Sequence, residues 1–181
     1  VLAMAIECGI DPLDCAAILP QIQGAAGRME SIECGQNFTA LVDYAHTPDA
    51  VKNVLSTAQE FTSGKVIALL GCGGDRDSTK RPLMGKALAE GSSVAIFTSD
   101  NPRSEDPEKI VTEMVGHLTI NQPSRVIIDR KSAIEYAVSL CQPGDTLLVL
   151  GKGHEIGQEI AGTIFDFDDR IVAAQAIEAR G

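Results

Sequence analysis

The sequence predicts an α/β fold: a mostly parallel β-sheet with helices on both faces, followed by a C-terminal hairpin and helix. Two observations predict it. Short apolar runs alternate strictly with segments of helical periodicity, which indicates strands joined by right-handed helical crossovers. The runs are also continuously apolar, as in Val66-Ile67-Ala68-Leu69-Leu70. A strand needs such a run when helices cover both faces of its sheet.

The first part of the chain differs from the rest. Two short helical patterns cover residues 1–8 and 12–19 and end at Gly9 and Pro20. A loose segment follows, and we place a domain boundary at its end, so that residues 1–27 and 28–181 form separate units. Because the chain opens within a helical pattern and without Met, we expect it to be part of a longer protein.

Strands and helices then follow in order. The apolar runs and their flanking turn residues predict strands at 28–34, 37–43, 66–70, 94–97, 125–128 and 146–150. Helical periodicity, with Pro or Asp at three of the starts, predicts helices at 48–61, 80–91, 107–118 and 130–141. The chain ends with a hairpin over 158–167 that turns at Ala161-Gly162 and a helix over 168–180.

Composition excludes several classes of function. The chain carries 15 basic and 25 acidic side chains, a net charge of −10, so we expect neither nucleic acid nor an anionic membrane as a partner. No apolar run reaches the length of a membrane span, and we expect a cytoplasmic protein. The five cysteines form no CxxC pair, which favours reduced and mostly buried thiols.

Unusual polar residues follow four of the predicted strands. The carboxyl ends of parallel strands meet at one edge of a sheet, where ligands of such folds gather, so these segments predict a binding site there. The segments are 43–49, 71–82, 98–103 and 151–155.

The glycine-rich segment after residue 70 indicates an anion site. Gly71, Gly73 and Gly74 let backbone N–H groups approach a ligand. Residues 71–86 carry four basic and two acidic side chains within an acidic chain. The order of residues is not that of a Walker A loop. The alternative is a glycine turn with solvated charges.

The three remaining segments carry charged or ionisable groups. Arg103, in Asp100-Asn101-Pro102-Arg103, suits a carboxylate, because guanidinium binds carboxylates through a two-pronged fork; the alternative is a turn with a surface ion pair. His46 and His154 could act as general bases, but no nucleophile motif and no metal-ligand spacing accompany them. The sequence therefore assigns no catalytic residue and no metal ligand.

Six ordered segments together resemble the C-terminal part of the Mur ligases, the ATP-dependent amide ligases of peptidoglycan synthesis. The segments are 27–30, 43–48, 71–77, 80–85, 100–103 and 151–155. The resemblance implies a Rossmann-like C-terminal domain preceded by the last helices of a central ATPase domain. It also implies that a carboxylate is activated as an acyl phosphate and attacked by an amine. ATP and Mg²⁺ would be held mainly by domains outside this chain, which alone should not catalyse ligation.

The segment 100–103 resembles the signature of family members that add meso-diaminopimelate to UDP-MurNAc-L-Ala-D-Glu. The resemblance implies that Arg103 pairs with the distal carboxylate of diaminopimelate and Glu155 with its distal ammonium. The resemblance also implies that the incoming amino acid is bound by seven residues: Arg76, Asp100, Asn101, Pro102, Arg103, Gly151 and Glu155. It places Arg28, Asp43 and His46 toward the nucleotide.

Three alternatives remain at this point. The chain could belong to a related ligase that adds lysine or another amino acid. It could be a non-catalytic module that binds an amino acid. A generic doubly wound domain would need six matching segments to arise by chance.

Overall fold

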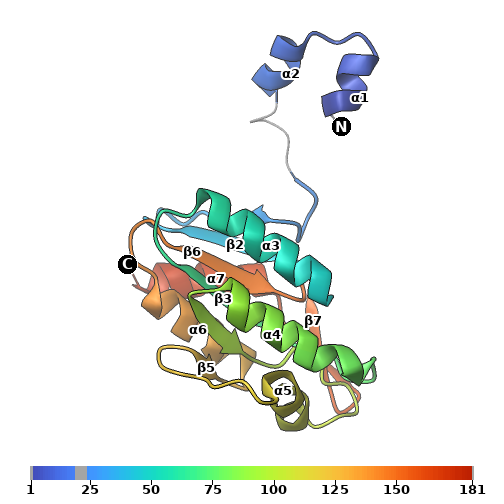
Figure 1. Cartoon of the computed structure of the whole chain (residues 1–181), viewed down its shortest axis with the longest axis vertical. Coiled ribbons are helices and arrows are strands. Elements are labelled where there is room, and N and C mark those ends of the chain that lie inside the picture. The colour runs from blue at the N-terminus through green and yellow to red at the C-terminus, as the bar shows by residue number, and fades with distance from the viewer. Residues whose placement is uncertain (1, 19–23, 181) are drawn as a thin grey trace.

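A six-stranded β-sheet forms the centre of the protein in the computed structural model, which describes residues 2–18 and 24–180 (Figure 1). The strand order is β1-β2-β6-β3-β4-β5, and every neighbouring pair is parallel except β1 with β2. The strands are β1 (Glu30–Ser31), β2 (Thr39–Asp43), β3 (Val66–Leu70), β4 (Val94–Phe97), β5 (Arg125–Val126) and β6 (Thr146–Leu150). The predicted mostly parallel sheet is confirmed.

Helices cover both faces of this sheet and give three layers. The core on one face packs α3 (Pro48–Phe61), α4 (Arg81–Gly91) and α5 (Pro107–Val115), and the core on the other packs α6 (Arg130–Leu140) and α7 (Asp169–Arg180). The short 3-10 helix η2 (Ser78–Lys80) leads into α4. All residues of β3, β4 and β6 are buried, as their continuous apolar runs predict.

Local signals set several of the boundaries. Helix α3 begins and ends as predicted, with Pro48 in its first turn and Thr47 as the N-cap, whose hydroxyl accepts a hydrogen bond from the Ala50 N–H at 3.3 Å. The Asp129 carboxylate caps α6 in the same way. The hairpin of β7 (Gly157–Ile160) and β8 (Thr163–Asp166) turns at Ala161-Gly162, both with positive φ, as predicted.

Several predicted elements are shorter in the structure, among them the strand predicted at 37–43, which begins at Thr39 as β2. The first strand is reduced to the two residues of β1, and the strand at 125–128 to the two residues of β5. Both strands lie at an edge of the sheet, and Val126 is 45% exposed, so burial on both faces was a wrong expectation for the outer strand. Helix α5 ends at Val115 because Gly116 takes a positive φ of 53°.

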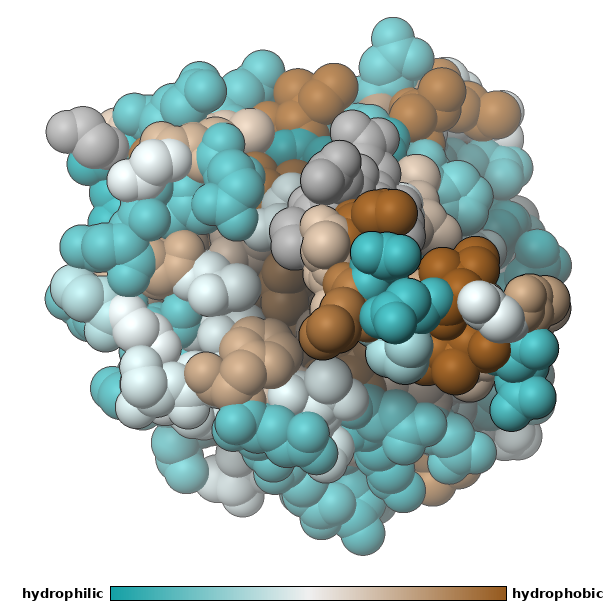
Figure 2. All heavy atoms as spheres, turned by 90° about the horizontal axis from the view of Figure 1, so that it is seen from above, coloured by the Kyte–Doolittle hydropathy of each residue, from teal (hydrophilic) through white to brown (hydrophobic). Residues whose placement is uncertain are grey.

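The N-terminal helices α1 (Leu2–Glu7) and α2 (Pro12–Ile18) contact each other. Figure 2 looks down on this end of the molecule and shows apolar side chains gathered on its surface. Met4 and Leu13 of these helices are 73% and 79% exposed. The predicted helix end at 19–20 and the start of the loose segment lie outside the described residues. No helix in the described ranges is long and apolar enough to cross a bilayer.

The cysteines follow the expected pattern in part. Cys15, Cys72 and Cys141 are buried, Cys34 is half-buried and Cys8 is exposed. Burial is the larger cause that raises the pKa of the Cys72 thiol to about 12, with the negative charge of Asp100 adding to it. A thiol in that state is protonated at neutral pH and is a poor nucleophile.

Candidate functional site

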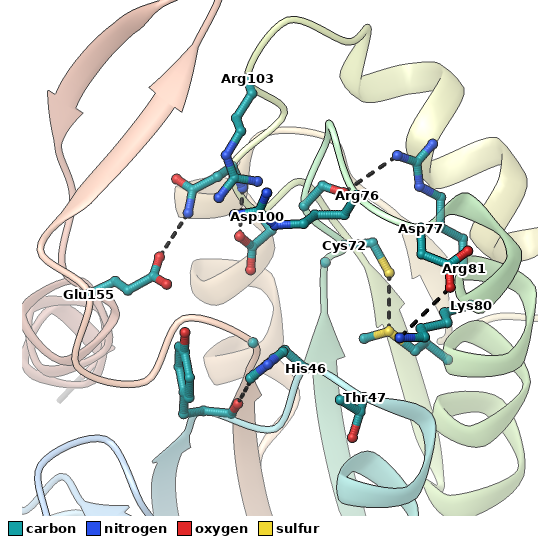
Figure 3. Close-up of a pocket in the computed structure, with 16 residues that line it drawn as sticks. His46, Thr47, Cys72, Arg76, Asp77, Lys80, Arg81, Asp100, Arg103 and Glu155 are labelled. Carbon is teal, nitrogen blue, oxygen red and sulfur yellow. Dashed lines mark hydrogen bonds and ion pairs between the residues drawn. The ribbon is translucent and has the colours of Figure 1, made fainter.

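A cavity of about 450 Å³ opens where β2, β3, β4 and β6 end. Its lining comes from all four segments that the sequence places at the carboxyl edge of the sheet. Figure 3 draws Arg103, Asp100 and Arg76 together at one end of the cavity, Glu155 at the side, and His46 and Thr47 at the opposite end. The predicted convergence of these segments on one edge is confirmed.

Seven of the ten predicted site residues line this cavity: Arg76, Asp100, Asn101, Arg103, Gly151, Glu155 and His46. The structure does not bring Pro102, Arg28 and Asp43 to its wall. Tyr44 and Cys72 also line it, although the sequence assigned them no role there. Their positions directly beside residues of the predicted site were the available signal. Lys80 and Arg81, which were counted toward the predicted anion site, line the cavity too.

Two of the converging loops interlock. The Gly74 N–H donates to the Asn101 carbonyl at 2.8 Å, and the Arg103 Nη1 donates to the Gly74 carbonyl at 2.7 Å. A Cβ at Gly74 would lie 1.9 Å from the Pro102 carbonyl oxygen, so only glycine fits. The glycines at this position therefore serve close packing between loops, a role that the sequence analysis did not foresee.

Arg103 is held by its backbone as well as by its side chain. Its φ is 52°, and its N–H and carbonyl bond to Glu159 and Ala161 of the hairpin at 2.9 and 2.7 Å. The guanidinium Nε lies 3.5 Å from Glu159 Oε2, and the side chain remains 23% exposed. Its second terminal nitrogen, Nη2, has no protein acceptor among the described residues. The side chain is thus fixed at the cavity wall with a donor left for a ligand.

Two acidic groups line the cavity: Asp100, which lies near Arg103 and Arg76, and Glu155 at the side (Figure 3). Asp100 is 8% exposed, and burial raises the pKa of its carboxyl, against the opposing charges of Arg130 and Lys152. Asn101 Nδ2 donates to Glu155 Oε2 at 2.8 Å, so the amide and the carboxylate form one unit. The cavity therefore presents both cationic and anionic groups, with Glu155 apart from the two arginines.

The basic character predicted for residues 71–86 is mostly compensated within the fold. The buried guanidinium of Arg81 contacts Glu105 and Glu113 at 2.7 Å each. Lys80 and Lys86 each lie 3.7 Å from a carboxylate. Of the four basic side chains, only Arg76 lies without an ion pair among the described residues. The summed charge of this segment therefore gives little support to an anion site, which stays a prediction.

The residues predicted to face a nucleotide surround Tyr44. The Arg28 guanidinium lies 5.1 Å from the centre of the Tyr44 ring, and the His46 ring lies 4.5 Å away. Asp43 is buried, and its two carboxylate oxygens accept the N–H groups of Met29 and Ala45 at 2.8 Å each. Asp43 thus fixes the chain segment that carries the Tyr44 and His46 rings.

The His, Cys, Asp and Glu side chains in the described part of the chain do not form a metal site. Within residues 2–18 and 24–180, no three His, Cys, Asp or Glu side chains gather closely enough to hold a metal ion.

Comparison with known proteins decides the family. A family model described as "Mur ligase, glutamate ligase domain" matches residues 27–153, more than half of the chain. The chain belongs to the Mur ligase family. The matched Mur ligase segment contains β1 to β6 and all the segments that line the cavity except the end of the 151–155 turn.

Relatives and solved structures agree with this assignment. The chain is 43% identical to a UDP-N-acetylmuramoyl-L-alanyl-D-glutamate–2,6-diaminopimelate ligase of Syntrophomonas wolfei over 99% of its length, and 48% identical to that of Streptomyces coelicolor over 98%. It spans 37% and 36% of these two Mur ligases. A solved structure of a ligase with the same name superposes with a TM-score of 0.83 at 42% identity, covering 99% of this chain and 37% of that one. MurC of Thermotoga maritima, at 17% identity and a TM-score of 0.62, shares the fold.

Proposed function

We propose that this chain is the C-terminal part of a MurE-type ligase that adds meso-diaminopimelate to UDP-MurNAc-L-Ala-D-Glu in the cytoplasm. Residues 1–27 would end the preceding ATPase domain, and 28–181 would form the domain that binds the incoming amino acid. The names of the relatives support the substrate, since each is a 2,6-diaminopimelate ligase. The other substrates and the catalysis would require the part of the protein beyond this chain.

The distribution of charge in the cavity carries the proposal. Diaminopimelate has an ammonium and a carboxylate at each end. The cavity presents Arg76 and Arg103 as cationic partners and Asp100 and Glu155 as anionic ones. In our assignment Arg103 Nη2 meets the distal carboxylate, and Glu155 meets the distal ammonium.

Lysine lacks the distal carboxylate. It would therefore leave the Arg103 donor at the cavity wall without its partner. A partly desolvated polar group left unpaired can discriminate between substrates by orders of magnitude. Arg103 cannot easily turn away, because its φ of 52° and the hydrogen bond to Gly74 fix both ends of the residue.

The proposal includes ATP and Mg²⁺, bound mainly outside this chain. ATP when bound would activate the substrate carboxylate as an acyl phosphate. The exposed Arg28 and His46, which flank Tyr44, would face the nucleotide when the domains close. Asp43 would hold their chain segment in place. The role of this chain is then to position the attacking amine and to exclude water from it.

The test measures ADP release by the complete ligase as the concentration of meso-diaminopimelate or of lysine is varied. Arg103→Lys should raise the KM for diaminopimelate at least about tenfold, because the lysine loses the fork that reaches both Gly74 and the ligand. Lys131→Met, at an exposed position on α6, is the matched control. An unchanged KM for diaminopimelate in Arg103→Lys contradicts the assignment.

Two further outcomes identify the alternatives. ADP release with lysine at a lower KM than with diaminopimelate would make the chain part of a lysine-adding ligase. Tight binding of diaminopimelate by the isolated chain, together with no ATP-dependent turnover by the complete protein, would indicate a binding module.

A further inference from the structure

We propose that Lys152 is a positioning residue of the amino-acid site, whose buried ammonium holds the Asn101 amide and the Glu155 carboxylate in one fixed arrangement. The inference rests on the proposed function, because both side chains are assigned to the incoming amino acid. Lys152 does not line the cavity, so it acts through the two residues that do.

All three donors of this ammonium are used inside the protein. The Lys152 side chain is 0% exposed. Its Nζ donates to the Gly157 carbonyl at 2.6 Å, to Asn101 Oδ1 at 3.3 Å and to Glu155 Oε2 at 3.4 Å. A buried ammonium is tolerated only when its donors are satisfied, so these three acceptors must stay together.

This arrangement fixes the direction of the Asn101 amide. Asn101 Oδ1 accepts from Lys152 and from the Glu159 N–H at 2.9 Å, while Nδ2 donates to Glu155 Oε2. Reversing the amide would turn its N–H groups toward two other donors. The wall of the cavity therefore presents a fixed order of donor and acceptor to a ligand.

The same contacts select which oxygen of Glu155 is available. Oε2 is bonded by both Asn101 and Lys152, so Oε1 is left for a ligand ammonium. The Glu155 side chain is 34% exposed, which gives a ligand access to it. Its backbone N–H bonds to the Lys152 carbonyl at 3.0 Å, so one tight turn carries both the carboxylate and the group that aims it.

The experiment is a double-mutant cycle in the complete ligase, with ADP release measured against meso-diaminopimelate and against ATP. The variants are Lys152→Met, Glu155→Gln and their combination, with Lys131→Met as the control for loss of a lysine at an exposed site. Lys152→Met should raise the KM for diaminopimelate at least about tenfold, because a hydrogen-bonded charge is lost from the site. The KM for ATP and kcat should change less than about threefold, as for a loss of binding common to ground and transition states.

The cycle separates positioning from a general structural role. In the Glu155→Gln background, Lys152→Met should raise the KM less than about threefold, since the carboxylate that it aims is already gone. The combination also removes both charges together, so it remains measurable if Lys152→Met alone does not fold. It should then have the KM of Glu155→Gln.

Several results overturn the inference. These are a small effect of Lys152→Met on the KM for diaminopimelate, an equal effect in both backgrounds, or a parallel rise in the KM for ATP. Each leaves the proposed function standing, because the unmodified ligase still responds to diaminopimelate. An unmodified ligase that releases no ADP with any amino acid overturns the proposed function, and the inference with it.

Discussion

We expect a conservative substitution in the buried ion pair between Arg130 and Asp169 to lower the free energy of unfolding more than one at an exposed pair. Both side chains are 0% exposed. Arg130 Nε and Nη2 donate to the two Asp169 oxygens at 2.8 and 2.7 Å, and the guanidinium also donates to the Ser99 and Leu150 carbonyls. One side chain thus connects the ends of β4 and β6 to the start of α7.

Asp169→Asn keeps the shape but removes the compensating charge and turns an amide N–H toward a guanidinium N–H. Leaving one member of a buried pair uncompensated costs about 3–5 kcal/mol. That is a large part of a stability of roughly 5–15 kcal/mol. It corresponds to a fall in Tm of roughly 6–20 °C, at about 2–4 °C per kcal/mol for a chain of this length.

Urea unfolding followed by far-UV circular dichroism measures the free energy directly, and an unchanged m value shows that only stability has changed. The control is Glu135→Gln, which breaks the exposed pair with Lys131 at 3.8 Å and should cost less than about 1 kcal/mol. Equal losses for the two variants would refute the reasoning, because burial is what distinguishes the two pairs.

Three more predictions follow from single contacts. Hydrogen bonds from Arg81, and then from a backbone N–H, lower the pKa of Glu105 from 4.5 to about 2, so its contribution to stability is complete above pH 4.5 and is lost as the pH falls toward 2. The Tm difference between the unmodified chain and Glu105→Gln should therefore shrink between pH 6 and pH 3, and a constant difference contradicts this. Gly74→Ala should destabilise the chain by about 1–3 kcal/mol in urea, because its Cβ meets a carbonyl of the neighbouring loop; a neutral result would mean that the loops can separate. Iodoacetamide at pH 8 should label the exposed Cys8 before Cys72, as followed by peptide mass spectrometry, and the reverse order would contradict the burial of the second thiol.

Structural features that depend on neighbouring residues could be predicted from the sequence. The continuous apolar runs of β3, β4 and β6 marked the buried strands, and Pro48 marked the start of α3. The Ala161-Gly162 turn was also visible, because positive φ favours glycine at such a position. These signals act within a few residues of the chain and need no knowledge of the tertiary structure.

Charge pairing was less predictable because its partners come from distant segments. Arg81 was counted as part of an anion site, yet its carboxylates lie on another loop and on α5. The segment 151–155 was predicted to border the binding site, but Lys152 within it was assigned no role, since its acceptors belong to three separate positions. A lysine only one glycine beyond the five buried residues of a strand was the available signal, because the chain is still inside the core at that point.

Strand order explains why these distant groups meet. β6 is the last strand of the main sheet in sequence, yet it lies between β2 and β3. The turn that follows it therefore enters the cavity from the centre of the sheet, between the segment after β2 and the glycine-rich segment after β3. From that position Lys152 can reach the loop after β4, and Glu155 can face the cavity beside it. An outer position for β6 would leave the same turn in solvent, where a lysine would need no fixed acceptors. Because β6 lies at the centre of the sheet, the short glycine-containing segment 151–155 after it can position the charged groups of the cavity wall.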